Sequence, residues 1–255
     1  MEKQERIIGS LIRRVMQTDS TNRRLRLKAA ALPEGAVYRA EHQTAGKGRL
    51  NRTWFSTPDS LTFSFLIRPQ LARQQLPLLA LFPAVSVART LREYGPAATV
   101  KWPNDIEAGG KKIGGILVEN RVKNDRAIES VIGVGLNVNQ AGDDWPDEIR
   151  RRAGSMRSIT GHRFDKEELF FRLIDNLDED YRRFFQPLQV LDLQHAWLAY
   201  CGHFHKDMAV TVRGQRVTGT FEALSENGGA VLSSGGIRLI IENFDGIEEA
   251  HAADD

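Results

Sequence analysis

The sequence predicts an α+β fold, in which a mixed, largely antiparallel sheet with helices is followed by a small β-barrel. Two observations support this fold class. In the first part of the chain, short apolar runs of strand length occur among longer stretches whose apolar residues recur at helical spacing. After Cys201 the helical spacing ends, and short strand-like runs separated by glycine-bearing turns remain. The first part therefore combines sheet and helix, whereas the last part is all β.

The expected helices are marked by an N-cap signal, by prolines and by apolar spacing. Asp19 or Ser20 is a suitable N-cap for the first helix, because a short polar side chain accepts hydrogen bonds from the free N–H groups of a first turn. Pro77 fits the first turn of the second helix, in which Pro83 is expected to produce a kink. The expected helices cover residues 20–31, 76–93, 165–185 and 191–200.

The expected strands are bounded by turn and loop signals. Residues 43–58 are polar, basic and glycine-bearing, which predicts a long loop, and Lys123-Asn124-Asp125 predicts the turn of a hairpin. These patterns predict two domains, residues 1–200 and residues 201–255, and the second ends in an acidic tail. The expected strands cover residues 36–41, 61–67, 98–101, 112–121 and 127–137 in the first domain, and 208–212, 215–223, 230–233 and 237–241 in the second.

The composition is that of an ordinary globular protein. The chain has 255 residues, of which 27% are charged, and it contains no apolar run long enough for a transmembrane helix and no apolar signal-peptide core. Its single cysteine, Cys201, cannot form an intrachain disulfide, which fits a cytoplasmic location. The net charge is only +2, but residues 3–28 are strongly basic. Because no aromatic residues interleave these cations, a solvated helix face is favoured over a nucleic-acid site.

The strongest functional signal lies between residues 101 and 119. This segment begins K-W-P-N-D-I and continues, a few residues later, as K-K-I-G-G-I-L-V-E. Trp102-Pro103 ends the preceding strand, so the polar residues beside it fall on a turn or at a strand end. Two cations, an amide and a carboxylate around a glycine-floored pocket suit a ligand with phosphates, a ribose and a carboxylate. The alternative is a β-hairpin with a charged, solvated tip.

Three further segments are unusual for their positions. Ser20-Thr21-Asn22 begins a helix, where N–H groups and hydroxyls can bind polar ligand atoms, although a simple helix cap is the alternative. The loop at 43–54 combines glycines with three cations and could close over phosphates, but it lacks the Gly-Lys-Ser/Thr of a P-loop. Residues 133–139 alternate small side chains on a strand, which leaves room for a ligand on one face.

In their combination and order these segments resemble the biotin–protein ligases. That family typically shows S-T-N, Q-x-A-G-R-G-R-x-G-R-x-W, K-W-P-N-D, K-x-x-G-I-L-V-E and G-x-G-x-N. This sequence has D-S-T-N, Q-T-A-G-K-G-R-L-N-R-T-W, K-W-P-N-D, K-I-G-G-I-L-V-E and G-V-G-L-N-V-N. The resemblance extends from residue 17 to residue 245, and five motifs in one order are highly specific. It implies a class II synthetase-like catalytic domain followed by an SH3-like β-barrel.

The resemblance implies an activity in two steps. ATP would activate biotin to biotinyl-5′-AMP, and the biotinyl group would then pass to a lysine of a biotin carboxyl carrier domain. Fixed cations are needed to bring two anions together, and magnesium, bound through the ATP phosphates, would neutralise the leaving pyrophosphate. A loop that closes over the mixed anhydride would protect it from water. ATP, Mg²⁺ and biotin are therefore the implied small molecules.

The residues that match the motifs take their implied roles from the family. Lys112 would sit between the biotin carboxylate and the α-phosphate, Arg49 would contact both groups, and Asp105 would orient the acceptor amine; these three are the implied catalytic residues. The implied biotin-binding residues are Ser20, Thr21, Asn22, Gln43, Gly46, Lys47, Gly48, Arg49, Lys112, Gly114 and Gly115. The implied ATP-binding residues are Arg49, Arg52, Trp54, Lys101, Asn104 and Asn137.

Two positions depart from the family pattern. Lys47 replaces a loop arginine and lacks its bidentate fork, and Asn51 replaces a glycine, although Asn tolerates left-handed backbone. The expected consequence is weaker retention of the adenylate, with activity kept. Nineteen residues precede Ser20, too few for a helix-turn-helix domain. The single-function form without specific DNA binding is therefore expected, and family members often pair as homodimers.

Three other interpretations compete with this one. A lipoate–protein ligase shares the fold and the adenylate chemistry, but K-W-P-N-D and the G-K-G-R loop argue against it. A biotin-binding regulator or a nucleic-acid-binding protein would use the basic N-terminus and the β-barrel, and steep salt dependence of DNA binding would support it. A degenerate ligase, impaired at Lys47, is the third interpretation.

Overall fold

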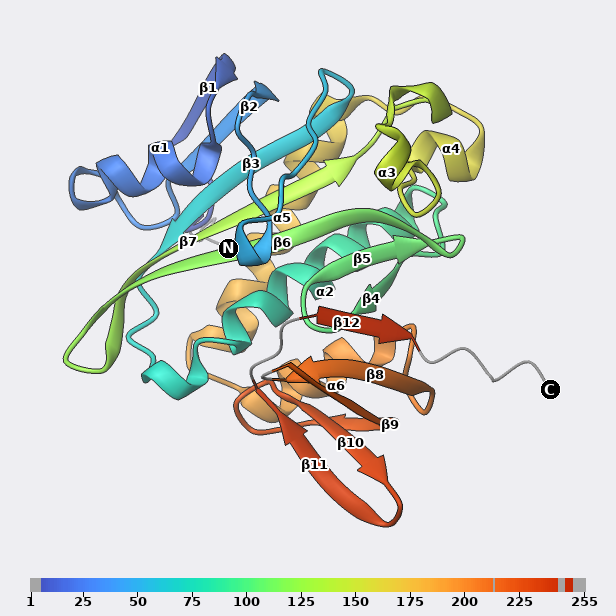
Figure 1. Cartoon of the computed structure of the whole chain (residues 1–255). Coiled ribbons are helices and arrows are strands. Elements are labelled where there is room, and N and C mark those ends of the chain that lie inside the picture. The colour runs from blue at the N-terminus through green and yellow to red at the C-terminus, as the bar shows by residue number, and fades with distance from the viewer. Residues whose placement is uncertain (1–5, 213, 243–245, 250–255) are drawn as a thin grey trace.

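The chain folds around two sheets, one of seven strands and one of five. The computed structural model describes residues 6–212, 214–242 and 246–249, so most of the predicted acidic tail lies outside the described residues. The seven-stranded sheet has the order β1-β2-β3-β7-β6-β5-β4, in which only β1 and β2 are parallel (Figure 1). Its strands are β1 (Ile12–Thr18), β2 (Val37–Gln43), β3 (Ser60–Ile67), β4 (Thr99–Lys101), β5 (Asp105–Ala108), β6 (Lys111–Lys123) and β7 (Arg126–Asn137). The predicted mixed, largely antiparallel sheet is confirmed.

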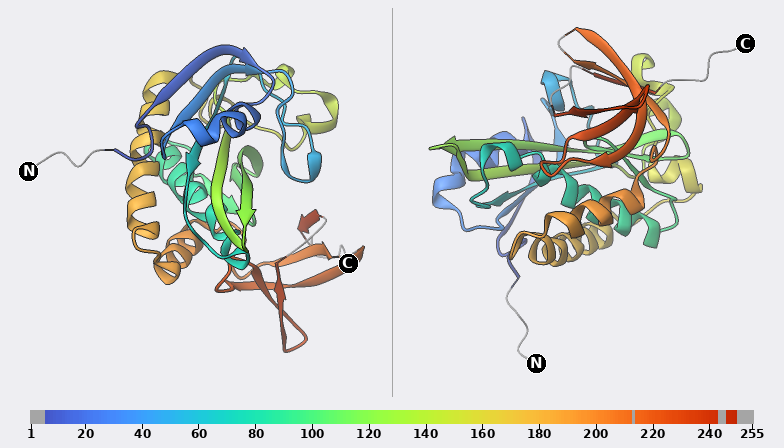
Figure 2. Two further views of the ribbon diagram at one scale, coloured as in Figure 1. Left: turned by 90° about the vertical axis from the view of Figure 1, so that its left-hand side faces the viewer. Right: turned by 90° about the horizontal axis from the view of Figure 1, so that it is seen from below.

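Two long helices cover one face of this sheet and leave the other face to α1 and the loop at 46–54 (Figure 2). Successive side chains of a strand point to opposite faces, so alternate residues of β3 pack against the elements on either side of the sheet. Phe63 and Phe65 belong to the core under the long helices, whereas Leu66 packs with Leu25 of α1. The helices are α1 (Thr21–Lys28), α2 (Leu78–Glu93), α3 (Asp147–Arg150), α4 (Met156–Thr160), α5 (Lys166–Phe185) and α6 (Val190–Tyr200).

Helix α5 is amphipathic, has an N-cap side chain and carries basic residues in its last turn. Asp165 is the N-cap, and its carboxylate accepts hydrogen bonds from the N–H groups of Glu167 (2.7 Å) and Glu168 (3.3 Å). Arginines lie in the last turn, where their positive charge interacts favourably with the negative end of the helix dipole. The buried stripe that faces α2 and the sheet is Leu169, Phe170, Leu173, Ile174, Leu177, Tyr181 and Phe184.

Replacing Asp165 by Ala should lower the free energy of unfolding by about 1 kcal/mol, because two N–H groups of the first turn lose their acceptor. Urea denaturation followed by circular dichroism measures this change. Asp147, an exposed residue of the short helix α3, is the matched control, and its replacement by Ala should change stability by less than about 0.5 kcal/mol. Equal midpoints for the Asp165 variant and the native chain would contradict the capping role.

The five-stranded antiparallel sheet is joined to the large sheet at the end of β4. Its order is β11-β10-β9-β8-β12, which confirms a small antiparallel β unit after Cys201. The indole N–H of Trp102 donates to the carbonyl of Gly228 (3.0 Å), and the N–H of Gly202 donates to the carbonyl of Val100 (3.0 Å). The strands are β8 (Asp207–Val212), β9 (Gln215–Leu224), β10 (Ala230–Ser234), β11 (Ile237–Ile241) and β12 (Gly246–Glu249).

Four parts of the fold differ from the prediction, and one of them is β12, which was not predicted. The basic N-terminal stretch does not form a helix face before residue 20, because Arg13 and Arg14 lie on β1, an edge strand that pairs only with β2. Residues 105–108 form β5 where no strand was predicted. Helices α3 and α4 were also not predicted, because the segment at 138–164 carries no clear apolar period. None of the helices in the described ranges has the length and apolar character needed to cross a bilayer.

Candidate functional site

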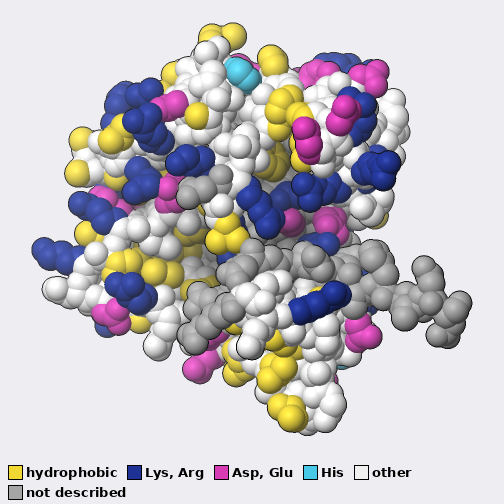
Figure 3. Space-filling model, in the orientation of Figure 1, with side chains coloured by type: hydrophobic (Ala, Val, Ile, Leu, Met, Phe, Trp, Pro, Cys, Tyr) yellow, Lys and Arg dark blue, Asp and Glu magenta, His cyan; other side chains and the backbone are white. Residues whose placement is uncertain are grey.

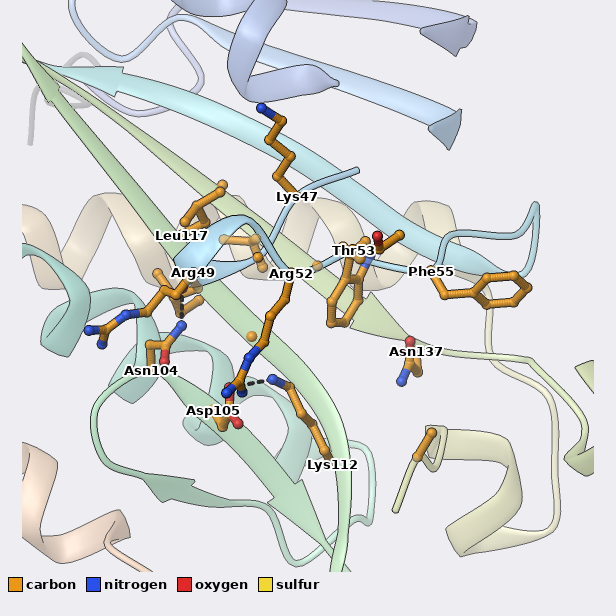
Figure 4. Close-up of a pocket in the computed structure, with 18 of the residues that line it drawn as sticks. Lys47, Arg49, Arg52, Thr53, Phe55, Asn104, Asp105, Lys112, Leu117 and Asn137 are labelled. Carbon is orange, nitrogen blue, oxygen red and sulfur yellow. Dashed lines mark hydrogen bonds and ion pairs between the residues drawn. The ribbon is translucent and has the colours of Figure 1, made fainter. Parts of the chain in front are cut away.

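A cavity of about 920 Å³ opens on the face of the large sheet that the long helices leave free (Figure 4). It is walled by the start of α1, the loop at 47–55, the turn after β4, the glycines of β6 and β7, and the segment at 145–153. One residue of the small sheet, Thr211 of β8, also lines it. Segments far apart in the sequence therefore meet at one hollow, which is large enough for a ligand the size of a nucleotide.

The start of α1 forms a buried polar cluster at one end of the cavity. Ser20 is the N-cap of the helix, as predicted, and its side chain accepts from the N–H of Arg23. The N–H of Thr21 donates to Gln43 Oε1 (2.7 Å), so the Gln43 side chain is fixed against the helix start. Asn22 Oδ1 accepts from the hydroxyl of Ser64 (2.6 Å). These side chains are held by the protein, which gives a ligand a preorganised set of polar partners.

Two glycines of β7 make the floor of the cavity flat. A Cβ atom at Gly133 would lie 2.3 Å from Asn22 Oδ1, and one at Gly135 would lie 2.6 Å from Cε2 of the Trp54 ring. Both distances are far shorter than any real carbon contact, so only glycine lets these side chains lie on the strand. The sequence analysis noted the small residues that alternate on this strand. In the structure they allow Asn22 and Trp54 to lie directly against the strand backbone.

The loop at 46–54 folds back on itself over the cavity. The N–H of Gly48 donates to the carbonyl of Arg52 (2.7 Å), and the N–H of Trp54 donates to the carbonyl of Gly46 (3.0 Å). Leu50 at the tip has a φ of 54°, the left-handed conformation that was expected nearby at Asn51. The hydrogen bonds at the base of the loop fix its ends, whereas Leu50 at its tip is exposed.

The three cations of this loop point in different directions (Figure 4). Arg52 reaches down towards Asp105 and Lys112, Arg49 lies beside Asn104, and Lys47 points away towards α1. Burial lowers the pKa of Arg49; the charge of Asp105 opposes this shift and the charge of Arg52 adds to it. Arginine stays protonated in proteins, so both guanidinium groups keep their charge at the cavity. An anionic ligand would balance that charge.

Lys112 and Asp105 form an ion pair in the cavity, with 2.5 Å between Nζ and Oδ1 (Figure 4). They lie on neighbouring strands, and Asp105 is directly opposite Gly115, whose missing side chain leaves space beside the pair. Lys101 forms a second, looser pair with Glu107 (3.3 Å). Both lysines keep part of their surface open to the cavity, so each can exchange its carboxylate partner for a ligand anion.

The main chain of Lys112 is held by the segment at 152–154. The N–H of Lys112 donates to the carbonyl of Arg152 (2.8 Å), and its carbonyl accepts from the N–H of Gly154 (2.9 Å). Asn137 supports this segment, because its amide donates to the carbonyl of Gly154 (2.9 Å). The Asn104 amide similarly donates to the carbonyl of Ile116 (2.5 Å). Both asparagines line the cavity, but their amide nitrogens are committed to the protein.

The charge of the cavity is strongly positive. Its lining includes two carboxylates, Asp105 and Glu107, against six cations, and Figure 3 shows Lys and Arg side chains gathered along the hollow above the small sheet. A recess lined by one sign of charge concentrates ligands of the opposite sign. The six cations are Lys47, Arg49, Arg52, Lys101, Lys112 and Arg152.

The structure brings together almost all the residues that the sequence singled out. Every predicted site residue lines the cavity except Gly46 and Gly114. A Cβ at Gly46 would meet the carbonyl oxygen of Trp54 (2.8 Å), so this glycine serves the loop base. A Cβ at Gly114 would meet Cδ2 of Leu136 (2.6 Å), so this glycine faces the core while Gly115 faces the cavity.

Sequence reasoning missed the apolar wall of the cavity. Trp145 is buried and packs against Phe55, with 6.3 Å between ring centroids. Ile149 and Ala153 continue this wall, and Arg152 adds a cation. The only signal in the sequence was a tryptophan in the middle of a charged stretch, G-D-D-W-P-D-E-I-R-R-R. Aromatic and apolar side chains in a cavity wall offer contact surface to a planar ring system such as a nucleobase.

The described residues of the cavity offer no ready-made protein site for a magnesium ion. Within the described ranges no three His, Cys, Asp or Glu side chains are grouped so as to hold a metal. The cavity carboxylates Asp105 and Glu107 are each paired with a lysine. The donor set therefore does not suit a protein-ligated ion, and Mg²⁺ carried on ligand phosphates remains a prediction.

Asp19 should make the fold more stable at neutral than at acid pH. Burial works to raise its pKa, but hydrogen bonds from the N–H of Ser20 and from Arg23 and Arg24 outweigh this effect and lower the pKa to about 2. Because the folded-state pKa lies below the ordinary value of 3.8, the stabilisation is complete well above pH 3.8 and is lost as the pH falls towards 2. The melting temperatures of the native chain and of Asp19→Asn should therefore differ at pH 6, and the difference should narrow steadily as the pH falls from 4 through 2. A constant difference across this range would contradict the prediction.

Comparison with known proteins places the chain in one family. Residues 14–137 match the Biotin/lipoate A/B protein ligase family. The chain is 33% identical over 230 residues to the bifunctional ligase/repressor BirA of Bacillus subtilis. The aligned region covers 87% of this chain and 66% of that relative, just under two thirds of its length. Among solved structures, the biotin protein ligase from Aquifex aeolicus in complex with biotin and ATP has a TM-score of 0.81 at 28% identity, covering 94% of this chain and 99% of that one.

A shorter relative is matched over nearly its whole length. The biotin–[acetyl-CoA-carboxylase] ligase of Paracoccus denitrificans is 30% identical over 237 residues, which cover 88% of this chain and 95% of that protein. The sequence motifs, the cavity that they build and this near-complete alignment agree, and together they show that the chain belongs to the biotin–protein ligase family.

Proposed function

We propose that this protein activates biotin with ATP to give biotinyl-5′-AMP and transfers the biotinyl group to a lysine of a biotin carboxyl carrier domain. The observation that carries the proposal is the convergence of five separate motifs on one cationic cavity, with Lys112 at its centre. The similarity to an Aquifex ligase bound to biotin and ATP supports it, as does the similarity to a Paracoccus enzyme named for ligation to acetyl-CoA carboxylase.

The two ends of the cavity suit the two substrates. The buried polar cluster of Thr21, Asn22 and Gln43 offers hydrogen-bond partners to a compact, uncharged ring such as the cyclic urea of biotin. The wall formed by Trp54, Phe55 and Trp145 offers apolar surface to adenine. Lys112 and Arg52 line the same cavity, and the carboxylate of biotin and the α-phosphate of ATP would meet beside them.

In the first step an oxygen of the biotin carboxylate attacks the α-phosphorus, and the bond to the leaving pyrophosphate breaks. No proton is transferred, so the protein contributes position and charge. Lys112 would leave Asp105 and bridge the two anions, which lowers their repulsion in a site partly shielded from water. Arg49 and Arg52 would balance the remaining phosphate charge. The folded loop at 46–54 would keep water from the mixed anhydride.

In the second step the amine of the carrier lysine attacks the acyl carbon, and the bond to the AMP oxygen breaks. The amine must reach the site uncharged and lose a proton as the amide forms. When Lys112 has turned to the anions, Asp105 becomes available as an acceptor for that amine. The ion pair seen here would then be the resting arrangement of two residues, Lys112 for the first step and Asp105 for the second.

Biotin-dependent exchange of labelled pyrophosphate into ATP tests the proposed function, with lipoate run in parallel. Exchange with biotin alone is the expected result. Exchange with lipoate alone would identify a lipoate ligase, and exchange with neither in folded protein with magnesium would support a degenerate ligase or a binding protein. Transfer is then tested with a purified biotin carboxyl carrier domain and its acceptor Lys→Arg variant, which should stay unlabelled.

We also propose residues 1–200 and 201–255 as the two functional units, because Thr211 of the second unit reaches the cavity built by the first. The carrier domain would approach beside this small sheet. A homodimer, the absence of specific DNA binding and a cytoplasmic location remain predictions of the same proposal. Analytical ultracentrifugation and salt titration of DNA binding test the first two.

A further inference from the structure

The main cavity is lined by four side-chain amides, and they differ in whether the protein satisfies their oxygens. Three of these oxygens accept a hydrogen bond from a neighbouring group. The fourth, Asn104 Oδ1, has no donor among the residues that the structure describes, although the Asn104 nitrogen is used. An amide oxygen without a donor can accept an N–H group of a ligand. The three satisfied contacts run from Ser64 to Asn22 Oδ1 (2.6 Å), from the N–H of Thr21 to Gln43 Oε1 (2.7 Å) and from Gln140 to Asn137 Oδ1 (3.3 Å).

The orientation of the Asn104 amide follows from its partner on β6. Its Nδ2 donates to the carbonyl of Ile116 (2.5 Å), and its backbone carbonyl accepts from the N–H of Ile116 (2.9 Å). A carbonyl only accepts, so the amide nitrogen must face Ile116 and the oxygen must face away from it. The buried polar atoms without a partner include Gln140 Oε1 but not Asn104 Oδ1, so the Asn104 oxygen is accessible. Asn104 therefore presents a fixed acceptor to the cavity.

This acceptor lies next to Asp105, the carboxylate that the proposed function gives to the attacking amine. The two residues are consecutive, and both line the cavity (Figure 4). Asp105 is directly opposite Gly115, and a Cβ on that glycine would lie 3.6 Å from Asp105 Oδ1. Because Gly115 has no side chain, a narrow group such as the end of a lysine side chain has room beside Asp105.

We infer that Asn104 Oδ1 and Asp105 together hold the attacking amine of the acceptor lysine, with a different task for each. This inference rests on the proposed function. An uncharged amine has two N–H groups and one lone pair, and the lone pair must point at the acyl carbon. Two acceptors that hold both N–H groups fix that direction, whereas a single carboxylate leaves the amine free to rotate about one hydrogen bond.

The two acceptors divide the protons of the amine between them. The nitrogen forms a bond to the acyl carbon of biotinyl-5′-AMP, the bond from that carbon to the phosphate oxygen breaks, and AMP leaves with the electron pair. The nitrogen loses one proton, which Asp105 accepts as a base. The other N–H remains in the product amide. Asn104 holds this second N–H, because an amide oxygen accepts a hydrogen bond but is too weak a base to take the proton.

Separate measurement of the two steps in Asn104→Ala tests the inference. Biotin-dependent pyrophosphate exchange measures adenylation, and mixing preformed adenylate on the enzyme with a saturating biotin carboxyl carrier domain measures transfer. Transfer should slow about tenfold, the effect of one lost hydrogen bond, while exchange should stay within about threefold of native. Transfer at the native rate, or an equal loss in both steps, would overturn the inference. Asn120 also lies on β6 but does not line the main cavity, so Asn120→Ala should leave both rates native.

A carrier domain with Nε-methyl-lysine as its acceptor separates the hydrogen bond from an indirect effect through β6. An uncharged secondary amine has a single N–H, which Asp105 takes, so none remains for Asn104. The native chain and Asn104→Ala should then transfer at rates within about twofold of each other. A tenfold difference with both acceptors would assign the loss to the strand and contradict the inference. If thermal melting shows that Asn104→Ala is unfolded, Asn104→Ser, whose hydroxyl is too short to reach the same point, takes its place in this comparison.

The native chain separates failure of this inference from failure of the proposed function. If the native chain exchanges pyrophosphate with biotin and labels the carrier domain, and Asn104→Ala transfers at the native rate, the function stands and the role of Asn104 is wrong. If the native chain neither exchanges pyrophosphate nor binds biotin in a calorimetric titration, both are wrong.

Discussion

Replacing Lys112 by Ala should reduce biotin-dependent pyrophosphate exchange by a factor of about 10² to 10³, the usual effect of removing one preorganised group that stabilises charge in a transition state. The loss has two physical causes. The two substrate anions lose the cation between them, and Asp105, which pairs with Lys112 at 2.5 Å, is left as an uncompensated negative charge in their path. The effect should therefore appear in kcat at saturating biotin and ATP.

Lys111 is the matched control for this experiment. It is the adjacent residue on β6, it is exposed, and it does not line the cavity. Lys111→Ala should keep native exchange to within about twofold, since surface substitutions away from special features are nearly neutral. Lys112→Arg keeps the charge but changes the shape of the group, so its activity should fall between the two. Native exchange in Lys112→Ala would remove this residue from the mechanism.

Adding one methyl group at Gly133 or at Gly135 should impair the use of two different substrates. A Cβ at Gly133 would collide with Asn22 Oδ1 (2.3 Å), whereas a Cβ at Gly135 would collide with the Trp54 ring (2.6 Å). Overpacking of this kind costs about 1–3 kcal/mol, which corresponds to a factor of about 5 to 150 in an equilibrium constant. Gly133→Ala should therefore raise the KM for biotin and Gly135→Ala the KM for ATP, each by about fivefold or more.

Exchange kinetics with each substrate varied separately would show this double effect. Gly142→Ala is the control, because a Cβ at Gly142 has no heavy atom within 4 Å and the change should leave both constants native. The informative result is the contrast between the two strand positions. If both variants raise the same KM, the two ends of the cavity are not the separate substrate sites proposed here.

The sequence indicated which residues lie together wherever a motif was unusual for its surroundings. Lysines, an asparagine and an aspartate at the end of an apolar strand conflict with an ordinary core, and the structure places Lys101, Asn104, Asp105 and Lys112 together on the cavity. The sequence could not decide between Gly114 and Gly115, since adjacent residues of a strand face opposite sides. Only the strand register shows that Gly115 faces the cavity.

What the sequence did not show depends on contacts between distant segments. Trp145 belongs to the cavity because it packs on Phe55, ninety residues earlier, and no local period signals that contact. Strand β1 was missed because an edge strand needs only one partner, and its arginines at positions 13 and 14 can face solvent. Tertiary context overrode local pattern in both cases.

The hydrogen bond from Trp102 to the carbonyl of Gly228 ties a residue of the K-W-P-N-D turn to a residue of a hairpin turn in the other sheet. Gly228 has a φ of 84°, a conformation that few side chains tolerate, so the acceptor is fixed by backbone geometry. Two constraints therefore act on one indole: it walls the cavity and it fastens the small sheet. A change that reshapes the turn around Gly228 would therefore also displace a residue of the cavity wall.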